Sequence, residues 1–120
     1  LSLVAETEYY ISSAYEAAAD VLASDATAVF ASSDNIALGL LKRMHEQGRR
    51  IPRDYSLVSY DNSAADALFE PSLTSIEQNV AELSHHAVGL MMRRLDNPAA
   101  DPVERVLKPH LVIKESVAAL

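Results

Sequence analysis

Apolar residues recur at helical spacing in three segments of the chain. In residues 9–24 and 34–47 the apolar positions fall within one arc at about 100° per residue, and most polar residues fall opposite. Residues 80–95 carry a wider apolar arc, which predicts a helix that is covered on more than one side. Ser33 is a suitable N-cap for the second helix, and the sequence from Asn79 resembles a capping box that opens the third.

Short runs rich in β-branched and aromatic residues separate or follow the predicted helices. Residues 27–31 form a run typical of a buried parallel strand, and residues 55–60 and 73–77 form two more. Residues 105–116 also have a strand pattern, but Pro109 interrupts it and indicates an edge, a bulge or a crossing point between lobes. The first two strands and the helix between them make a right-handed βαβ unit. The pattern therefore predicts an α/β fold in which helices flank a parallel sheet.

The composition is that of one acidic globular domain. The 120 residues are 49% hydrophobic and include 10 Lys and Arg against 17 Asp and Glu, a net charge of −7. Because non-specific DNA affinity comes from basic residues on phosphates, we do not expect this segment to hold nucleic acid by itself. The absence of Cys excludes disulfide scaffolds and Cys-ligated zinc sites and suits a cytoplasmic location.

The sequence gives no sign of a membrane segment. No apolar stretch approaches the roughly 20 residues that span a bilayer, and residues 1–10 lack the basic and apolar regions of a signal peptide. We therefore expect no membrane partner. Because residue 1 is not Met, we expect the chain to be processed or to be a piece of a longer protein.

Polar residues follow two of the predicted strands. Ser32-Ser33-Asp34 comes at the end of the first, at a helix N-terminus, and Tyr60-Asp61-Asn62 comes at the end of the second. In open α/β sheets, ligands bind outside the carboxyl ends of the strands. The Asp61 carboxylate can accept two hydrogen bonds there from a polyol or a base edge, or it can simply cap the loop that follows.

The chain lacks the sequence signals of the common enzyme classes. It has no Cys nucleophile, no Gly-x-Ser-x-Gly motif, no phosphate-binding glycine loop and no HExxH motif. His85 and His86 are adjacent and project about 100° apart on a helix, so they do not chelate one metal as an i, i+4 pair would. We expect no enzyme activity, no metal site and no cofactor.

A phospho-receiver domain is a competing interpretation. Such a domain needs an Asp at a strand end and a downstream Lys-Pro, which Asp61 and Lys108-Pro109 imitate. It also needs a pair of acidic residues at the end of its first strand to hold Mg²⁺. The strand before Asp61 supplies only Asp34, so this interpretation is the weaker one.

Several short motifs follow one another in three segments, TAVFASSDNIALGLLKRMHEQGRRIPRDYSLVSYDN, then PSLTSIEQNVAELSHHAVGLMMRRL, then LVIKESVA. In their order these motifs resemble the effector-binding core of LacI-type (LacI/GalR) transcriptional repressors. They match a helix start with "ALG", a "G-x-x-(I/V)-P-x-D" turn, a strand ending in "(F/Y)-D" and a "P-x-L-T-(S/T)-(I/V)-x-Q" segment. The resemblance covers roughly residues 9–118, and the order and spacing of the motifs are more specific than any one of them.

This resemblance implies a periplasmic-binding-protein-like fold of two lobes with a small-molecule effector, a sugar or a nucleoside-like compound, in the cleft between them. Residues 1–77 then correspond to the C-terminal lobe, 78–113 to a crossover segment with one helix, and 114–120 to a C-terminal tail. Members of the family are homodimers that bind operator DNA through a helix-turn-helix headpiece, for which we expect no counterpart in this chain. An exported sugar-binding protein of the same fold is the alternative.

The resemblance also implies roles for individual residues. Asp61 matches the cleft aspartate that accepts hydrogen bonds from the effector, and Tyr9 falls where an aromatic ring packs on it; a hydrophobic contact at the helix entry is the alternative for Tyr9. Ser33 matches an effector-contacting Asn of some relatives, although capping alone explains it. Gln78 lies at the hinge segment and is a further effector contact.

Three apolar residues match the dimer contact of the family: Leu38, Leu68 and Phe69. Leu38 lies off the apolar arc of its helix, which fits a contact surface but also fits a tolerated exposed Leu. The chain departs from the family pattern at Ser59, where Gly is common, and the arginine that clamps the effector belongs to a segment upstream of Leu1. We therefore expect this segment alone to bind effector weakly or not at all.

Overall fold

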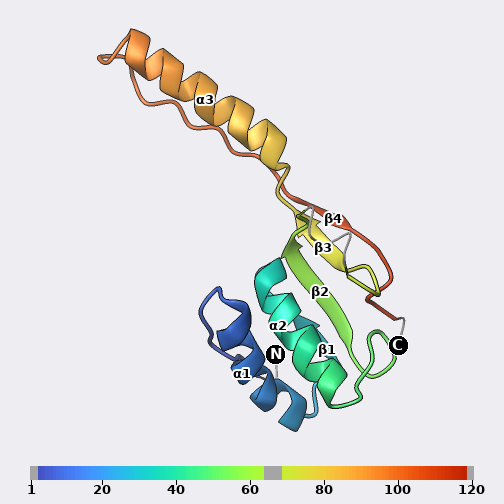
Figure 1. The fold of residues 1–120 in the computed structure, drawn as a ribbon. Coiled ribbons are helices and arrows are strands. Elements are labelled where there is room, and N and C mark those ends of the chain that lie inside the picture. The colour runs from blue at the N-terminus through green and yellow to red at the C-terminus, as the bar shows by residue number, and fades with distance from the viewer. Residues whose placement is uncertain (1–2, 64–68, 119–120) are drawn as a thin grey trace. The chain divides into compact units, whose positions relative to one another are not determined.

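The computed structural model describes residues 3–63 and 69–118. Along the chain the elements are α1 (Ile11–Ala23), β1 (Ala28–Phe30), α2 (Asp34–Glu46), β2 (Ser56–Asp61), β3 (Thr74–Glu77), α3 (Val80–Asp96) and β4 (His110–Val112) (Figure 1). Except for the last strand, which is shorter than its pattern, each element begins and ends within two residues of its predicted bounds. Backbone contacts divide the chain into two units. Unit 1 runs up to Glu77 and resumes at Leu111, and unit 2 is Gln78–His110.

The strands form one sheet in the order β1-β2-β3-β4. β1 and β2 pair in parallel, with Val29 opposite Leu57, and β2 and β3 pair in parallel, with Val58 opposite Thr74. This confirms the predicted α/β fold with a parallel sheet. The prediction that the first strand is buried is wrong. β1 lies at an edge of the described sheet, so Ala28 is exposed and the side chain of Phe30 is 57% exposed.

The core of unit 1 lies between α2 and the sheet. Leu57 of β2 and Leu73, just before β3, are fully buried and belong to one apolar cluster with Ala37 and Met44 of α2. Burial of one such leucine stabilises the fold by about 1.5–3 kcal/mol. Buried and less buried residues alternate along β2, so one face of the strand packs against α2. This packing fixes the orientation of the residues at the end of the strand.

α1 packs directly against α2 (Figure 1), and Gly39 permits the close approach. A Cβ at Gly39 would lie 2.5 Å from the carbonyl oxygen of Ile11 and 2.7 Å from the backbone nitrogen of Tyr15. The Tyr15 hydroxyl donates a hydrogen bond to Glu46, and the Arg43 guanidinium carbon lies 4.8 Å from the Tyr15 ring centroid. The hydrogen bond from Tyr15 is the main reason that the pKa of Glu46 is lowered.

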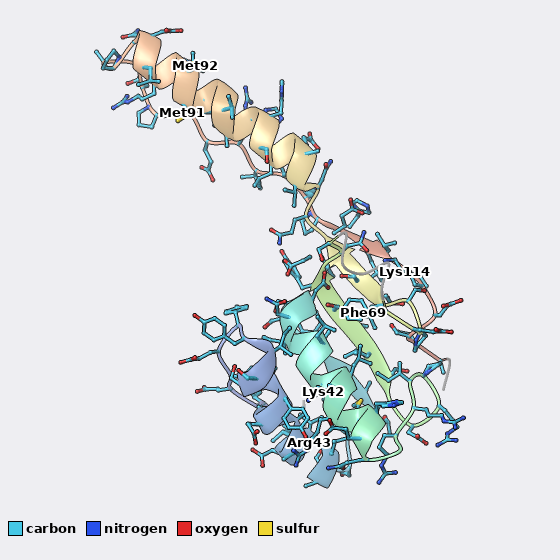
Figure 2. All side chains as sticks on the ribbon, viewed as in Figure 1. Lys42, Arg43, Phe69, Met91, Met92 and Lys114 are labelled. Carbon is cyan, nitrogen blue, oxygen red and sulfur yellow. The ribbon has the colours of Figure 1, made fainter. Side chains whose placement is uncertain are left out.

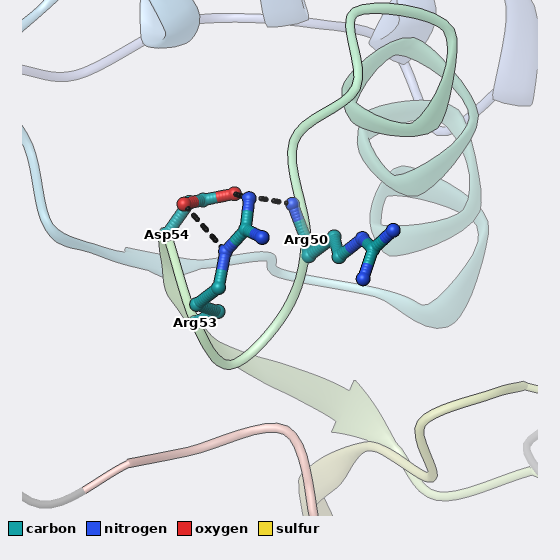
Figure 3. Close-up of polar contacts among 3 residues, drawn as sticks. All are labelled: Arg50, Arg53 and Asp54. Atoms are coloured by element: carbon teal, nitrogen blue, oxygen red, sulfur yellow. Dashed lines mark hydrogen bonds and ion pairs between the residues drawn. The ribbon is translucent and has the colours of Figure 1, made fainter.

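The turn that joins α2 to β2 is held by Asp54. Its carboxylate accepts hydrogen bonds from the backbone N–H of Arg50 at 2.7 Å and from Nε and Nη2 of Arg53 at 3.1 and 2.8 Å (Figure 3). The Arg53 hydrogen bonds, followed by the Arg50 N–H, lower the pKa of Asp54. Gly48 begins the turn at φ 70°, a backbone conformation that favours glycine. The Gly-x-x-Ile-Pro-x-Asp pattern therefore forms this turn, and its role is structural.

Unit 2 consists of α3 and the segment that follows it. The predicted capping by Asn79 is confirmed, since Asn79 Oδ1 accepts a hydrogen bond from the N–H of Glu82 at 3.3 Å. The Glu82 side chain bonds the side-chain amide of Asn79, whose Nδ2 donates to Glu82 Oε2 at 2.7 Å, instead of the backbone N–H that a capping box uses. The prediction that α3 is covered on more than one side is wrong for the described chain, since none of its residues is buried. Met91 and Met92 project from α3 (Figure 2) and are 56% and 50% exposed. The apolar arc exists, but unit 2 contains no second element to pack against it.

The segment after β4 is bonded to the sheet of unit 1. β4 begins directly after Pro109, and the boundary between the two units lies between His110 and Leu111, as a crossing point requires. Ser116 is fully buried. Its carbonyl accepts from the N–H of Leu57 at 2.9 Å, and its hydroxyl donates to the Leu57 carbonyl and accepts from the N–H of Thr74 at 2.8 Å. Ser116, expected to lie in a tail, is thus an integral part of unit 1.

Candidate functional site

The two polar strand ends meet at one edge of the sheet. β1 and β2 are parallel neighbours, so Ser32-Ser33-Asp34 and Asp61 leave the sheet on the same side. Asp34 is buried, and its carboxylate accepts hydrogen bonds from the Ser59 hydroxyl at 2.6 Å and from the backbone N–H of Ser63 at 2.9 Å. Asp34, which follows β1, therefore holds the loop that follows β2.

Ser59 is the position at which Gly is common in the resembling family. Here its hydroxyl is fully buried and is bonded to Asp34. A buried carboxylate is costly unless its oxygens are hydrogen-bonded. The Ser59 hydroxyl and the Ser63 N–H meet this need, one for each oxygen of Asp34. Asp34 is thus structural, and the departure at Ser59 supports the loop rather than disturbing it.

Asp61 ends β2 and is partly exposed. It lies opposite Glu77, the last residue of β3, in the parallel register. Its φ is 109° and that of Asn62 is 50°, so two successive non-glycine residues lie in the left-handed region. Such a conformation costs free energy and persists only where the surroundings impose it.

Asn62, which the sequence did not single out as a site residue, is hydrogen-bonded to three residues around this loop. Its N–H donates to the buried hydroxyl of Ser75 at 3.1 Å. Its side-chain amide donates to Glu77 Oε2 at 3.0 Å and accepts from Lys114 Nζ at 2.6 Å. The sequence shows Asn62 at a strand end, in Tyr60-Asp61-Asn62. Lys114 is 52 residues away from it, however, and no local pattern connects the two residues.

Tyr9 and Ser33 lie close to the first strand end. The Ser33 hydroxyl accepts a hydrogen bond from the N–H of Ile36 at 3.2 Å and the residue is buried, which confirms its predicted role as N-cap of α2. The carbonyl of Tyr9 accepts from Asn35 Nδ2 at 3.4 Å, so the backbone before α1 lies beside the first turn of α2. Tyr9 as a whole is 64% exposed.

Of the remaining candidates, Gln78 directly follows Glu77 and is the first residue of unit 2. Leu38 is partly buried on α2, and Phe69 is partly buried and packs against the core of unit 1 (Figure 2). Leu68 lies outside the described residues.

The chemistry available at this edge is hydrogen bonding. Carboxylates, an amide, hydroxyls and an ammonium group are gathered there on Asp61, Glu77, Asn62, Ser75 and Lys114. Within residues 3–63 and 69–118, no three His, Asp or Glu side chains are grouped to hold a metal ion. His86 instead faces Glu82, with 3.7 Å between Nε2 and Oε1.

No described helix is long and apolar enough to cross a membrane.

Comparison with known proteins identifies a family to which the chain is similar. Residues 2–117 match the model of the periplasmic binding protein-like domain family. The chain is 37% identical over 105 residues to the HTH-type transcriptional repressor PurR of Pasteurella multocida, covering 86% of this chain and 31% of that protein. It is 39% identical over 94 residues to the ribose operon repressor of Haemophilus influenzae, covering 78% and 28%.

Among solved structures, a LacI family transcriptional regulator from Enterococcus faecium with bound ribose superimposes with a TM-score of 0.93 at 33% identity. The match covers 98% of this chain and 44% of that one. The chain thus spans about a third of the length of the curated relatives that it matches.

Proposed function

Because the chain belongs to the periplasmic binding protein-like domain family, we propose that it forms the larger part of one lobe, with a crossover segment, in the effector-binding core of a LacI-type transcriptional repressor. The relatives over most of its length are repressors, and a regulator with bound ribose has the same fold. Family membership leaves the phospho-receiver interpretation without support. An exported sugar-binding protein of this fold remains the alternative, but the named relatives do not favour it.

The observation that carries the proposal is the loop Asp61–Ser63 at the carboxyl ends of the strands. Ligands of open parallel sheets bind at this edge. Asp61 is partly exposed there and lies beside Glu77, while Asp34 and Ser75 hold the residues that follow it. A carboxylate in this position accepts hydrogen bonds from two hydroxyls of a sugar or from a base edge.

The other proposed effector contacts are Tyr9, Ser33 and Gln78. The exposure of Tyr9 and its closeness to the start of α2 support a ring that packs on the effector. For Ser33 the support is weaker, because its hydroxyl already caps α2. Gln78 follows Glu77 at the point where the chain leaves unit 1, which fits a contact at a hinge.

The proposed partners of the complete protein are a sugar or nucleoside-like effector, operator DNA through a separate headpiece, and a second copy of the chain. The proposed dimer contact uses Leu38, Leu68 and Phe69. A complete regulator that sediments as a monomer at micromolar concentration would contradict the dimer. A repressor of this kind acts in the cytoplasm and is not an enzyme.

Calorimetric titration of the complete regulator with D-ribose and with a purine base tests the proposal. We expect one of them to bind, and Asp61→Asn to weaken that binding about 10- to 100-fold, the loss of about 1.5–3 kcal/mol that removal of a charged hydrogen-bond acceptor causes. The matched control is Asp20→Asn, which removes one carboxylate from the exposed side of α1. Unchanged affinity in Asp61→Asn would refute the site.

A further inference from the structure

We propose that Asn62, Glu77 and Lys114 form a positioning clamp that sets the orientation of the Asp61 loop for effector binding and ties it to both chain segments that join the two units. The clamp residues are not assigned to the effector itself. This inference rests on the proposed function, since it concerns how the same site is held.

The side-chain amide of Asn62 is held in one orientation. Its oxygen accepts from the ammonium group of Lys114 at 2.6 Å, and its nitrogen donates to the carboxylate of Glu77 at 3.0 Å. Rotation of the amide by half a turn would place N–H against N–H and oxygen against oxygen. Both hydrogen bonds are charge-assisted, so they are stronger than neutral ones. Only one orientation of the side chain is therefore favourable.

The backbone of the loop has an unusual conformation. Asp61 and Asn62 have φ values of 109° and 50°, which non-glycine residues seldom adopt. Such conformations persist when surrounding contacts over-determine them, and they concentrate at ligand-binding sites. Here the contacts come from both sides, since Asn62 is bonded to Ser75, Glu77 and Lys114 while the next residue, Ser63, is bonded to Asp34.

The two charged residues lie next to the points where the chain leaves and re-enters unit 1. Glu77 is the last residue of unit 1 before the chain leaves it, and Lys114, which Figure 2 labels, follows closely after the chain returns at Leu111. Glu77 and Lys114 lie within unit 1 and meet on one amide. A shift of either joining segment therefore moves a partner of Asn62, and movement of the loop acts on both segments. Contiguous hydrogen-bond networks of this kind carry energetic coupling between sites.

The test uses the complete regulator and two measurements. In the first, amide hydrogen exchange is followed without ligand in Lys114→Met, which keeps the side-chain stem and removes the ammonium group. We expect exchange of peptides covering 60–63 to rise at least tenfold. The matched control is Lys108→Met, the same change at an exposed residue of unit 2. Unchanged exchange at 60–63 in Lys114→Met would overturn the clamp whether or not a ligand binds.

In the second measurement, D-ribose and then a purine base are titrated against the same variants. We expect Lys114→Met to weaken the ligand that binds at least tenfold and Lys114→Arg, which keeps a charged donor, to restore most of the affinity. Faster exchange with unchanged affinity would overturn the positioning role. If neither probe binds the wild type, the proposed function fails and the clamp's part in binding fails with it. The exchange result then still decides whether the clamp holds the loop.

Discussion

Units 1 and 2 contain similar amphipathic helices but differ in what covers them. In unit 1, α2 buries Ala37, Leu40 and Met44 against the sheet. In unit 2, no residue of α3 is buried, and among its large apolar residues only Leu90 is partly buried. The others are about half exposed or more: Val80, Leu83, Val88, Met91, Met92 and Leu95. The apolar arc of α3 is the wider of the two in the sequence, yet α3 is the more exposed helix, so a periodic pattern identifies a helix face without identifying its neighbour.

Unit 1 is stabilised by its own tertiary contacts, whereas unit 2 is not. Unit 1 has a core, a close helix–helix contact and buried polar groups that are hydrogen-bonded, and it carries the candidate site. Tertiary packing supplies most of the stability of helices in proteins. Because no residue of α3 is buried, the stability of this capped helix in unit 2 depends on local propensity. The same substitution should therefore have different effects in the two units.

The largest expected difference comes from Gly→Ala in the two helices. In Gly39→Ala the new Cβ would meet backbone atoms of α1 at 2.5–2.7 Å, so we expect the free energy of unfolding to fall by about 1–3 kcal/mol. In Gly89→Ala the new Cβ meets nothing within 4 Å, and the better helix propensity should stabilise α3 by about 0.5–1 kcal/mol.

Chemical denaturation measures the first change, and hydrogen exchange of peptides from α3 measures the second. Equal effects of the two substitutions would break the comparison between the units. Destabilisation by Gly89→Ala would show that the face of α3 at Gly89 is covered in the complete protein.

A smaller effect is expected at the turn that carries Asp54, within unit 1. The carboxylate holds Arg50 and Arg53, and these contacts lower the pKa of Asp54 below its ordinary value of 3.8. A lowered pKa in the folded state contributes stability above pH 3.8, and that contribution disappears as the pH falls through the folded-state value. Asp54→Asn should therefore be slightly less stable than wild type at pH 7 and equal to it at low pH.

Denaturation midpoints of wild type and Asp54→Asn between pH 2 and 7 give the comparison, with Asp20→Asn as the control for loss of one exposed carboxylate. A constant difference at all pH values would mean that the turn does not depend on the ionised form.

Most of the fold could be predicted because its elements carry local signals. The Ser33 cap, the Asn79 cap and the β-branched runs each act over a few residues, and the structure confirms them. The burial of β1 and the cover of α3 could not be predicted, because each depends on what lies against the element. The role of Ser116 also depends on contacts made 42 and 59 residues away in the sequence.

The candidate site could be predicted only in part, for the same reason. The position of Asp61 at a strand end follows from the strand pattern, and parallel strands place it beside the end of β1. The separation of roles between Asp34 and Asp61 does not, because it requires knowledge that Ser59 and Ser63 satisfy the buried carboxylate. Asn62 and Lys114 were missed because their connection is wholly tertiary.

The most direct measurement is a crystal structure of the complete regulator with the ligand that binds it, D-ribose or a purine base. The account predicts that polar atoms of the ligand lie within hydrogen-bond distance of the Asp61 carboxylate, with Asn62 still bonded to Glu77 and Lys114. A ligand bound elsewhere, or an Asp61 side chain turned away from it, would contradict the account.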